Sequence, residues 1–244
     1  MTDSFVKTQA GAPPGFFAAD ARGLQWLGEV TDGPPVPQVL EVSEHRLVTT
    51  RVPQGSPSSA GAEAFGAALA ATHRAGAPSY GAAHDGFIGP LPLDNTPSQS
   101  WPEWYAERRV LPFVRAAVDG GGLSLGQAHT VETACGRIDD AGATPARIHG
   151  DLWSGNVIWG ADGRCWLVDA GAAHGGHRET DLAMLALFGL PHLDVVVAAY
   201  DDAWPLADGW QDRVGLHQLH PLLVHAVLFG GGYGARAAAI AVRM

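Results

Sequence analysis

The hydrophobic positions near the start of the chain change their period. Between Phe16 and Glu29 the apolar side chains recur at helical spacing, which predicts an amphipathic helix. Residues 38–42 and 46–52 instead alternate apolar and polar side chains around a short polar turn, which predicts a pair of strands. The run Phe5-Val6-Lys7 is apolar and β-prone, and it predicts a further strand ahead of the helix. The chain therefore begins with a small unit of strands and one helix.

Beyond a linker at residues 53–57, which contains proline and glycine, the pattern becomes helical. Ser59 is suited to cap a helix that runs through His73, and a Trp-rich helix is expected to begin near Trp101. A loop rich in proline and asparagine is expected between these helices, from Gly81 to Ser100. Further helices are predicted at residues 124–139, 179–188, 194–203 and 212–229.

This layout predicts an α+β fold with two lobes. The first would be a small, strand-rich N-lobe at residues 1–55, and the second a larger helical C-lobe at residues 56–244. A chain of 244 residues is long enough to bury a substantial core in such an arrangement. We expect a cleft between the two lobes.

Charge and cysteine content narrow the possible partners and location. The formal net charge is −10 and no block of Lys or Arg is present, so neither nucleic acid nor an anionic membrane is an expected partner. No apolar run approaches the length of a membrane span, and the N-terminal residues do not resemble a signal peptide. Cys135 and Cys165 are far apart and outside any CxxC motif, which indicates reduced thiols in a cytoplasmic protein.

The stretch from Ile148 to Ile158 carries the most specific chemistry. It contains Asp151 and, five residues later, Asn156, and Asp169 follows at the end of the next apolar strand. Phosphoryl transfer from ATP requires a carboxylate that accepts the proton of the substrate hydroxyl, and oxygen ligands that hold divalent cations. The catalytic loop of kinases has the same Asp-x4-Asn spacing. The pattern predicts Asp151 as the catalytic base and Asn156 and Asp169 as metal ligands.

The segment His149-Gly-Asp-Leu-Trp-Ser-Gly-Asn156 resembles the catalytic loop of the fructosamine (ketosamine) kinase family, whose members have a protein-kinase-like fold. Relatives that phosphorylate antibiotics or choline usually carry another residue in place of Trp153. Residues 168–184, which include Gly-His-Arg-Glu and Asp-Leu-Ala, are similar to a second motif of the family. The likeness continues through residues 86–92, 205–210 and 228–233, so it covers essentially the whole chain.

The resemblance implies ATP and Mg²⁺ as cofactors. Lys7 matches the lysine that binds the phosphates, and Asp20 stands where the family usually has the glutamate that pairs with it. The shorter acid would have to reach farther. Thr50, Arg51 and Val52 fall where the hinge between the lobes contacts the adenine.

The resemblance also implies a reaction and a substrate. The family phosphorylates the 3-hydroxyl of a sugar attached to an amine (a ketosamine), free or protein-bound, and the unstable product then sheds the sugar. Trp153 is expected to contact the sugar ring, and His177 is expected in a loop near the substrate. A zinc pair of His174 and His177 lacks a third ligand and is disfavoured. Asp181 is expected to bond backbone N–H groups and brace the catalytic loop.

One departure from the family leaves alternatives open. Family members carry two more strands and a Gly-rich turn ahead of the lysine, whereas Lys7 is almost the first residue here. Either the start site is wrongly placed or the protein is genuinely shortened; for the sequence as given, an open edge at the Lys7 strand is expected, and with it weak ATP binding. The alternatives are a kinase that acts on an aminoglycoside, choline or homoserine, and an inactive pseudokinase. The presence of Asp151, Asn156 and Asp169 together argues against the second.

Overall fold

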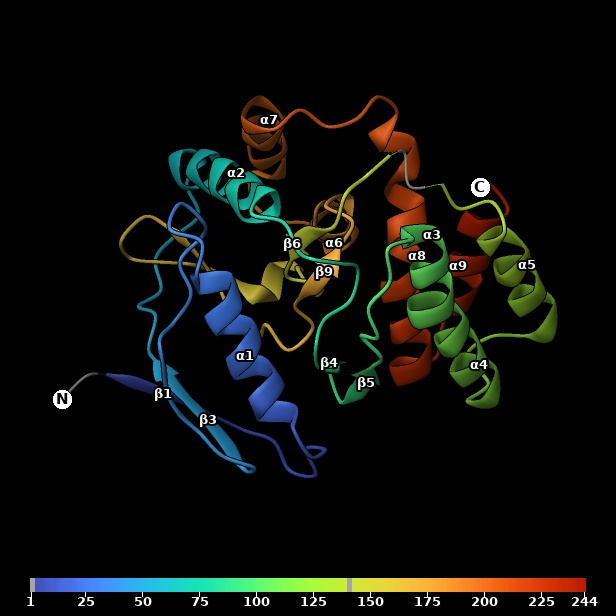
Figure 1. The fold of residues 1–244 in the computed structure, drawn as a ribbon, viewed down its shortest axis with the longest axis horizontal. Helices are drawn as coiled ribbons and strands as arrows, with labels where there is room; N and C mark the ends of the chain where they lie inside the picture. The colour runs from blue at the N-terminus through green and yellow to red at the C-terminus, as the bar shows by residue number, and fades with distance from the viewer. Residues whose placement is uncertain (1–2, 140–141) are drawn as a thin grey trace.

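An antiparallel sheet and one helix form the N-terminal region of this computed structural model, which describes residues 3–139 and 142–244. The elements are β1 (Ser4–Thr8), α1 (Phe16–Gly28), β2 (Val39–Val42) and β3 (Arg46–Thr50) (Figure 1). The strands lie in the order β1-β3-β2, so β1 forms an edge of the sheet, as predicted. Lys7 of β1 lies opposite Leu47 of β3.

The predicted amphipathic helix is confirmed, because α1 buries its apolar stripe against the sheet and the rest of the core. Phe17, Leu24 and Leu27 are almost fully buried, and they share a hydrophobic cluster with Leu47 of β3. Removing such side chains from water is the main favourable contribution to folding. The helix therefore holds a fixed position relative to the strand that carries Lys7.

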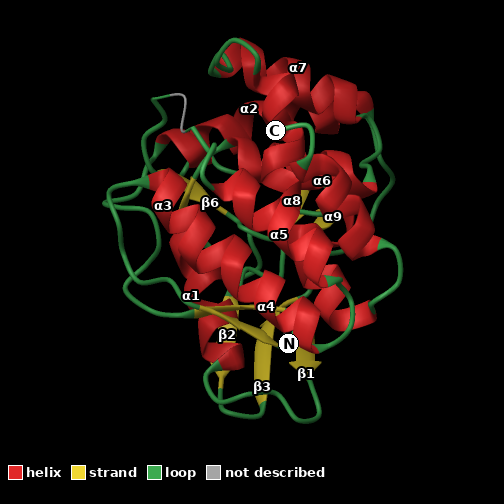
Figure 2. Ribbon diagram, turned by 90° about the vertical axis from the view of Figure 1, so that its right-hand side faces the viewer, coloured by secondary structure: helices red, strands yellow, loops and turns green. Residues whose placement is uncertain are grey.

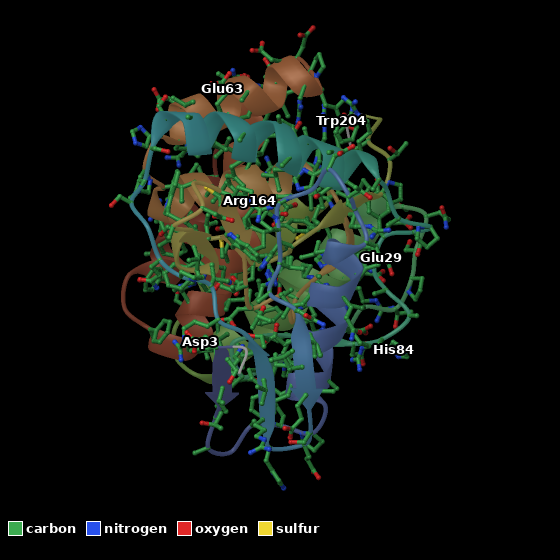
Figure 3. All side chains as sticks on the ribbon, turned by 90° about the vertical axis from the view of Figure 1, so that its left-hand side faces the viewer. Asp3, Glu29, Glu63, His84, Arg164 and Trp204 are labelled. Atoms are coloured by element: carbon green, nitrogen blue, oxygen red, sulfur yellow. The ribbon has the colours of Figure 1, made fainter. Side chains whose placement is uncertain are left out.

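A pair of helices lies at the far end of the molecule from this sheet. They are α2 (Ser59–Arg74) and α7 (Leu193–Ala203), and they pack side by side. In Figure 3, Glu63 on α2 lies near the top of the molecule, and Asp3, just before β1, lies in the lower half, with the sheet extending below it. The cap of α2 is Ser58, whose hydroxyl accepts a hydrogen bond from the Gly61 N–H at 3.1 Å, and not Ser59 as predicted.

The remaining helices lie close together (Figure 2), and the core between them is rich in aromatic residues. Trp101, Trp104 and Tyr105 are buried there, as expected for core packing. The helices are α3 (Trp101–Tyr105), a π-helical turn (Ala106–Val110), α4 (Leu111–Asp119), α5 (Leu125–Cys135), α6 (Glu179–Phe188), α8 (Trp210–Phe229) and α9 (Tyr233–Ala241). Among the described residues, α9 was not predicted, and the long predicted loop contains a hairpin.

Three two-stranded antiparallel sheets complete the fold. They are the hairpin of β4 (Gly86–Ile88) with β5 (Leu91–Leu93), the pair of β6 (Ala146–Ile148) with β9 (His174–Gly176), and the hairpin of β7 (Val157–Trp159) with β8 (Cys165–Leu167). The segment between β6 and β7 is the one that carries the Asp-x4-Asn motif. Strand-rich elements at the N-terminus and helices elsewhere agree with the predicted fold class. Within the described residues, none of the helices combines the length and the apolar character needed to cross a membrane.

Candidate active site

The loop between β6 and β7 is anchored by a single apolar side chain. Leu152 is fully buried in the cluster that also contains residues of α1 and α2, so its neighbours Asp151 and Trp153 are held at the surface of that core. Asn156 closes the loop, because its Nδ2 donates to the backbone oxygen of Asp151 at 2.8 Å. Gly150 adopts a φ of 79°, a left-handed conformation that favours glycine.

Asp181, in the first turn of α6, braces this loop as predicted. Its two carboxylate oxygens accept hydrogen bonds from the backbone N–H groups of His149 at 2.8 Å and Gly150 at 2.9 Å. Its Oδ2 also lies 3.1 Å from Nε2 of His73, whose Nδ1 is 2.8 Å from the hydroxyl of Tyr200. Burial alone would raise the pKa of Asp181, but the hydrogen bond and charge of His73 lower it below its ordinary value. The loop is thus tied to an ionised, buried carboxylate.

The residues around Asp169 interlock with the catalytic loop. Nε2 of His149 lies 2.9 Å from the carbonyl oxygen of Val168, and the Val168 N–H donates to the backbone oxygen of Asn156 at 3.1 Å. Asp169 itself has a φ of 58°, which is uncommon for a residue other than glycine. Such backbone conformations concentrate at functional sites, where the surrounding structure holds them in place.

Lys7 joins the N-terminal sheet to both acidic residues of the cleft. Its Nζ lies 2.8 Å from Oδ2 of Asp20 and 2.7 Å from Oδ1 of Asp169. Burial lowers the pKa of Lys7, but the two carboxylates outweigh this effect and raise it above its ordinary value. Burial has the opposite effect on the carboxyl group of Asp20: it raises the pKa above the ordinary value, although the charge and hydrogen bond of Lys7 counteract part of this effect. Three residues that are distant in the sequence therefore meet in one ion-pair network, with Asp20 placed as the resemblance implied.

A close approach of α1 explains how an aspartate reaches Lys7 where a glutamate was expected. The second oxygen of Asp20 accepts a hydrogen bond from the Ala170 N–H at 2.8 Å, so the helix is tied to the loop that follows Asp169. Gly23 lies one turn farther along α1, and a Cβ there would be 2.8 Å from the carbonyl carbon of Ala170 and 2.9 Å from its Cβ. Only glycine allows the helix to lie this close to Ala170.

The pKa of the Asp151 carboxyl group is raised to a value that suits a base near neutral pH. Burial raises its pKa to about 6, and the negative charges of Asp169 and Asp181 act in the same direction. The charge of His149 and the hydrogen bond from Asn156 act in the opposite direction but do not cancel the effect. A general base is most effective when its pKa lies close to the working pH.

A cavity of about 200 Å³ opens between the sheet and the β7–β8 hairpin. Its walls include each of the residues predicted to bind the cofactor together with Asp169; these are Lys7, Asp20, Thr50, Arg51, Val52 and Asp169. A larger cavity, of about 420 Å³, lies against α1 and the loop at residues 77–86. The walls of this larger cavity contain neither Lys7 nor Asp151, Asn156 or Asp169. The types of residue that line the smaller cavity, and not its size, therefore identify it as the candidate site.

His177 is buried and does not lie in an open loop. It follows β9, and its ring is buried between Trp101, at 4.8 Å between ring centroids, and His217, at 4.5 Å. The glycines before it pack closely instead of forming an open loop: a Cβ at Gly175 would be 2.8 Å from the Cβ of Ala77. His177 lines a small cavity together with Gly150 of the catalytic loop, and its contact with a substrate stays a prediction.

His177, Glu179 and His217 bring three ligand-type atoms within 4.8 Å of one another. Glu179 is already engaged, because Arg213 donates to both of its carboxylate oxygens, at 2.6 Å and 2.9 Å. The contact with His217, whose Nε2 lies 3.4 Å from Oε2 of Glu179, and the hydrogen bonds from Arg213 overcome the effect of burial and lower the pKa of Glu179 to about 2. The guanidinium group therefore supplies the positive charge that a metal ion would otherwise bring, and we interpret the cluster as a buried ion pair.

Trp153 is 41% exposed, and its ring lies 6.1 Å from that of Phe188 at the end of α6. The sequence interpretation missed Phe188, as it missed the contact of Asp181 with His73 and that of His73 with Tyr200. The His73 and Tyr200 side chains meet across 127 positions of sequence, and no local spacing signals such a pair. Phe188 ends an apolar helix, where its pattern is that of a core residue.

Comparison with known proteins identifies the family. The model of the fructosamine kinase family matches residues 1–244. A protein of Thermus thermophilus, named a probable ketoamine kinase, is 37% identical over 93% of this chain and 82% of its own length. A crystal structure from Thermobifida fusca, of a protein provisionally named fructosamine-3-kinase, has a TM-score of 0.92 and 52% identity, and the match covers 98% of this chain and 84% of the other.

A more distant structure extends the likeness of the fold alone. The choline kinase LicA of Streptococcus pneumoniae is 14% identical, with a TM-score of 0.63 over 98% of this chain and 84% of its own. The predicted kinase-like fold is thereby confirmed. Because the family model matches from the first residue to the last, and the curated relative agrees with it, the chain belongs to the fructosamine kinase family.

Proposed function

We propose that this protein transfers the terminal phosphoryl group of ATP to the 3-hydroxyl of the sugar of a ketosamine. The proposal rests on one observation above all: in a chain of the fructosamine kinase family, Lys7 and Asp169 form an ion pair in the cleft, next to the loop that carries Asp151 and Asn156. The structure from Thermobifida fusca is named for the same position of the sugar. Ketosamines, free or attached to protein, are the proposed substrates.

In this proposal Asp151 accepts the proton of the sugar hydroxyl. A carboxyl group with a pKa of about 6 is largely ionised at neutral pH, yet it is a stronger base than an exposed aspartate. The Asp181 brace holds the backbone on the N-terminal side of Asp151, and Asn156 holds its carbonyl oxygen. Trp153, two residues farther on, would face the sugar ring.

The residues of the cleft fit ATP and a divalent cation. Lys7 presents an ammonium group to the cavity, as required for a phosphate contact, and Thr50, Arg51 and Val52 line the side expected for the adenine. Asp169 offers carboxylate oxygens, and Asn156 turns its Nδ2 toward Asp151, which leaves the amide oxygen for a cation. Carboxylate and amide oxygens are ligands that Mg²⁺ accepts, and Mg²⁺ would neutralise charge on the phosphates.

Two further parts of the proposal concern organisation and location. Residues 1–55 and 56–244 would act as the two lobes on either side of the cleft. The cell compartment would be the cytoplasm, where the free thiols of Cys135 and Cys165 stay reduced. The phosphorylated product would release its sugar spontaneously, so that the reaction removes glycation from amines.

A panel of acceptors tests the proposal. The protein would be incubated with ATP, Mg²⁺ and, separately, fructosyl-lysine, choline, homoserine or an aminoglycoside, and product formation followed by ³¹P NMR. We expect turnover with fructosyl-lysine and a phosphate at its 3-position. Turnover with choline, homoserine or the aminoglycoside alone would show a kinase of another specificity, and no turnover with any acceptor would indicate an inactive protein.

A further inference from the structure

An exposed group of aromatic side chains adjoins the catalytic loop. Phe188 is the last residue of α6 and Phe229 the last of α8, and their side chains are 38% and 68% exposed. Together with Trp153 they form a contiguous surface, here called the aromatic patch, which consists of Trp153, Phe188, His225, Phe229 and Tyr233. Large exposed apolar surfaces of this kind mark binding sites in soluble proteins.

The aromatic patch is built around one imidazole ring. The ring of His225 lies 4.9 Å from that of Phe188, 5.5 Å from that of Phe229 and 5.0 Å from that of Tyr233. Its Nδ1 lies 2.7 Å from the carbonyl oxygen of Pro221 one turn earlier in α8, which fixes the plane of the ring. Two phenylalanines from different helices therefore share one support, and their exposed faces have a defined arrangement.

Trp153 connects the aromatic patch to the catalytic loop. The Trp153 N–H donates to the carbonyl oxygen of Asp151 at 3.1 Å, and the indole ring covers Gly155, where an added Cβ would lie 2.8 Å from the ring atom Cε2. Phe188 is the neighbour of Trp153 in this aromatic series, with 6.1 Å between the ring centroids. When the sugar hydroxyl of a substrate reaches Asp151, the remainder of the molecule must extend out of the cleft. One direction open to it leads past Trp153 onto the aromatic patch.

A ketosamine has two parts with different chemistry: a polar sugar, and a secondary amine that is protonated near neutral pH and carries an organic substituent. Aromatic faces attract organic cations, and they bury alkyl groups at the same time. A single exposed carboxylate would bind the ammonium group without distinguishing between substituents. The side chains of the aromatic patch contain no carboxylate, so they would select for the ammonium and its alkyl substituent together.

We propose that Phe188 and Phe229 form the subsite for the amine half of the substrate. This inference rests on the proposed function and specifies its substrate class: ketosamines whose nitrogen carries an extended apolar chain, such as the four-carbon stem of a lysine side chain. The chain lies across the two phenylalanine faces, and the ammonium group lies at the edge of the patch nearer Trp153. Ketosamines with a small or absent substituent leave this surface uncovered and bind more weakly.

The test compares two substrates and three variants. The substrates are the ketosamines that glucose forms by Amadori rearrangement with n-hexylamine and with ammonia, which differ only in the chain on nitrogen. The variants are Phe188→Ala, Phe229→Ala and, as a matched control, Leu125→Ala, which shortens an apolar side chain on α5 that is 78% exposed and outside the aromatic patch. We expect each phenylalanine variant to raise KM for the hexyl substrate about five- to tenfold more than KM for the small one, and Leu125→Ala to change neither.

The possible outcomes separate this inference from the proposed function. An equal effect on both substrates would show that the phenylalanines merely support the loop, and would overturn the subsite. The same conclusion would follow if the parent protein did not prefer the hexyl substrate. If the parent phosphorylates no ketosamine, the proposed function fails, and calorimetric titration with the hexyl ketosamine then decides the subsite. Equal affinity of the parent and Phe229→Ala would overturn it, and weaker binding by the variant would support it.

Discussion

The close contact between α1 and the loop after Asp169 makes Gly23 a sensitive position. In the Gly23→Ala variant the new methyl group would lie 2.8 Å and 2.9 Å from two carbon atoms of Ala170. Carbon atoms pack at about 3.5–4.0 Å, so the helix and the loop must separate by roughly 1 Å. The hydrogen bond from the Ala170 N–H to Asp20, 2.8 Å long, would then exceed the range of a good hydrogen bond, and Lys7 could no longer keep its contacts of 2.8 Å with Asp20 and 2.7 Å with Asp169 at once.

Two magnitudes follow from this separation. Forcing an extra methyl group into a packed interior costs about 1–3 kcal/mol of stability. Misplacing a group of the active site by about 1 Å can cost on the order of 100-fold in rate, and here Lys7 loses the partner that orients it. We therefore expect Gly23→Ala to lower kcat/KM far more than its modest loss of stability would suggest, with the apparent affinity for ATP reduced.

The assay is steady-state kinetics with ATP as the varied substrate, alongside thermal unfolding. Gly126→Ala on α5 is the control, because a Cβ at Gly126 meets nothing within 4 Å; its activity should equal that of the parent. Adding Asp20→Glu to Gly23→Ala should restore part of the ATP affinity, since the longer acid spans the widened gap. Parent-like kinetics in Gly23→Ala would refute the idea that this contact brings Asp20 within reach of Lys7.

Three further predictions concern the catalytic loop. Because burial raises the pKa of Asp151 to about 6 and the ionised form is the base, kcat/KM should be level above that pH and fall about tenfold per unit below it; a midpoint near pH 4 would contradict the assignment. Asn156→Ala and Asp169→Ala should each raise the Mg²⁺ concentration needed for half-maximal activity, and an unchanged requirement in both would remove them from the metal site. Asp181→Asn should lower the free energy of unfolding by about 2–4 kcal/mol in urea titrations, since the carboxylate that accepts two loop N–H groups and faces His73 is lost; wild-type stability would mean that the brace is dispensable.

The sequence predicted the parts of the site that are encoded by short-range patterns. Asp151, Asn156 and Asp169 lie within one loop and the end of a nearby strand, so their spacing alone brings them together. Lys7 and Asp20 lie in adjacent elements, and the ion pair that the family resemblance implied for them is present, whereas their role in binding ATP stays a prediction. Short-range patterns also gave the amphipathic helix α1, because its apolar stripe faces one side only.

The features that the sequence did not predict depend on contacts between distant segments. His177 follows two glycines, which suggested an open loop, but those glycines form β9 and pack against β6, which buries the histidine. Residues 86–93 looked like a loop because of their glycines and prolines, yet they form the hairpin β4–β5. Phe229 ends a largely buried helix, and only the assembled fold shows that its ring remains exposed beside His225.

The central claim is that the cleft between Lys7 and the catalytic loop phosphorylates ketosamines with Asp151 as the base, and Asp151→Asn tests it most directly. The initial rate of phosphate transfer from ATP to fructosyl-lysine would be measured for the parent and the variant, with circular dichroism to verify that both are folded. The account predicts a loss of about 100- to 10,000-fold in the variant, as expected when a general base is removed. Transfer by Asp151→Asn within a few-fold of the parent rate would contradict it.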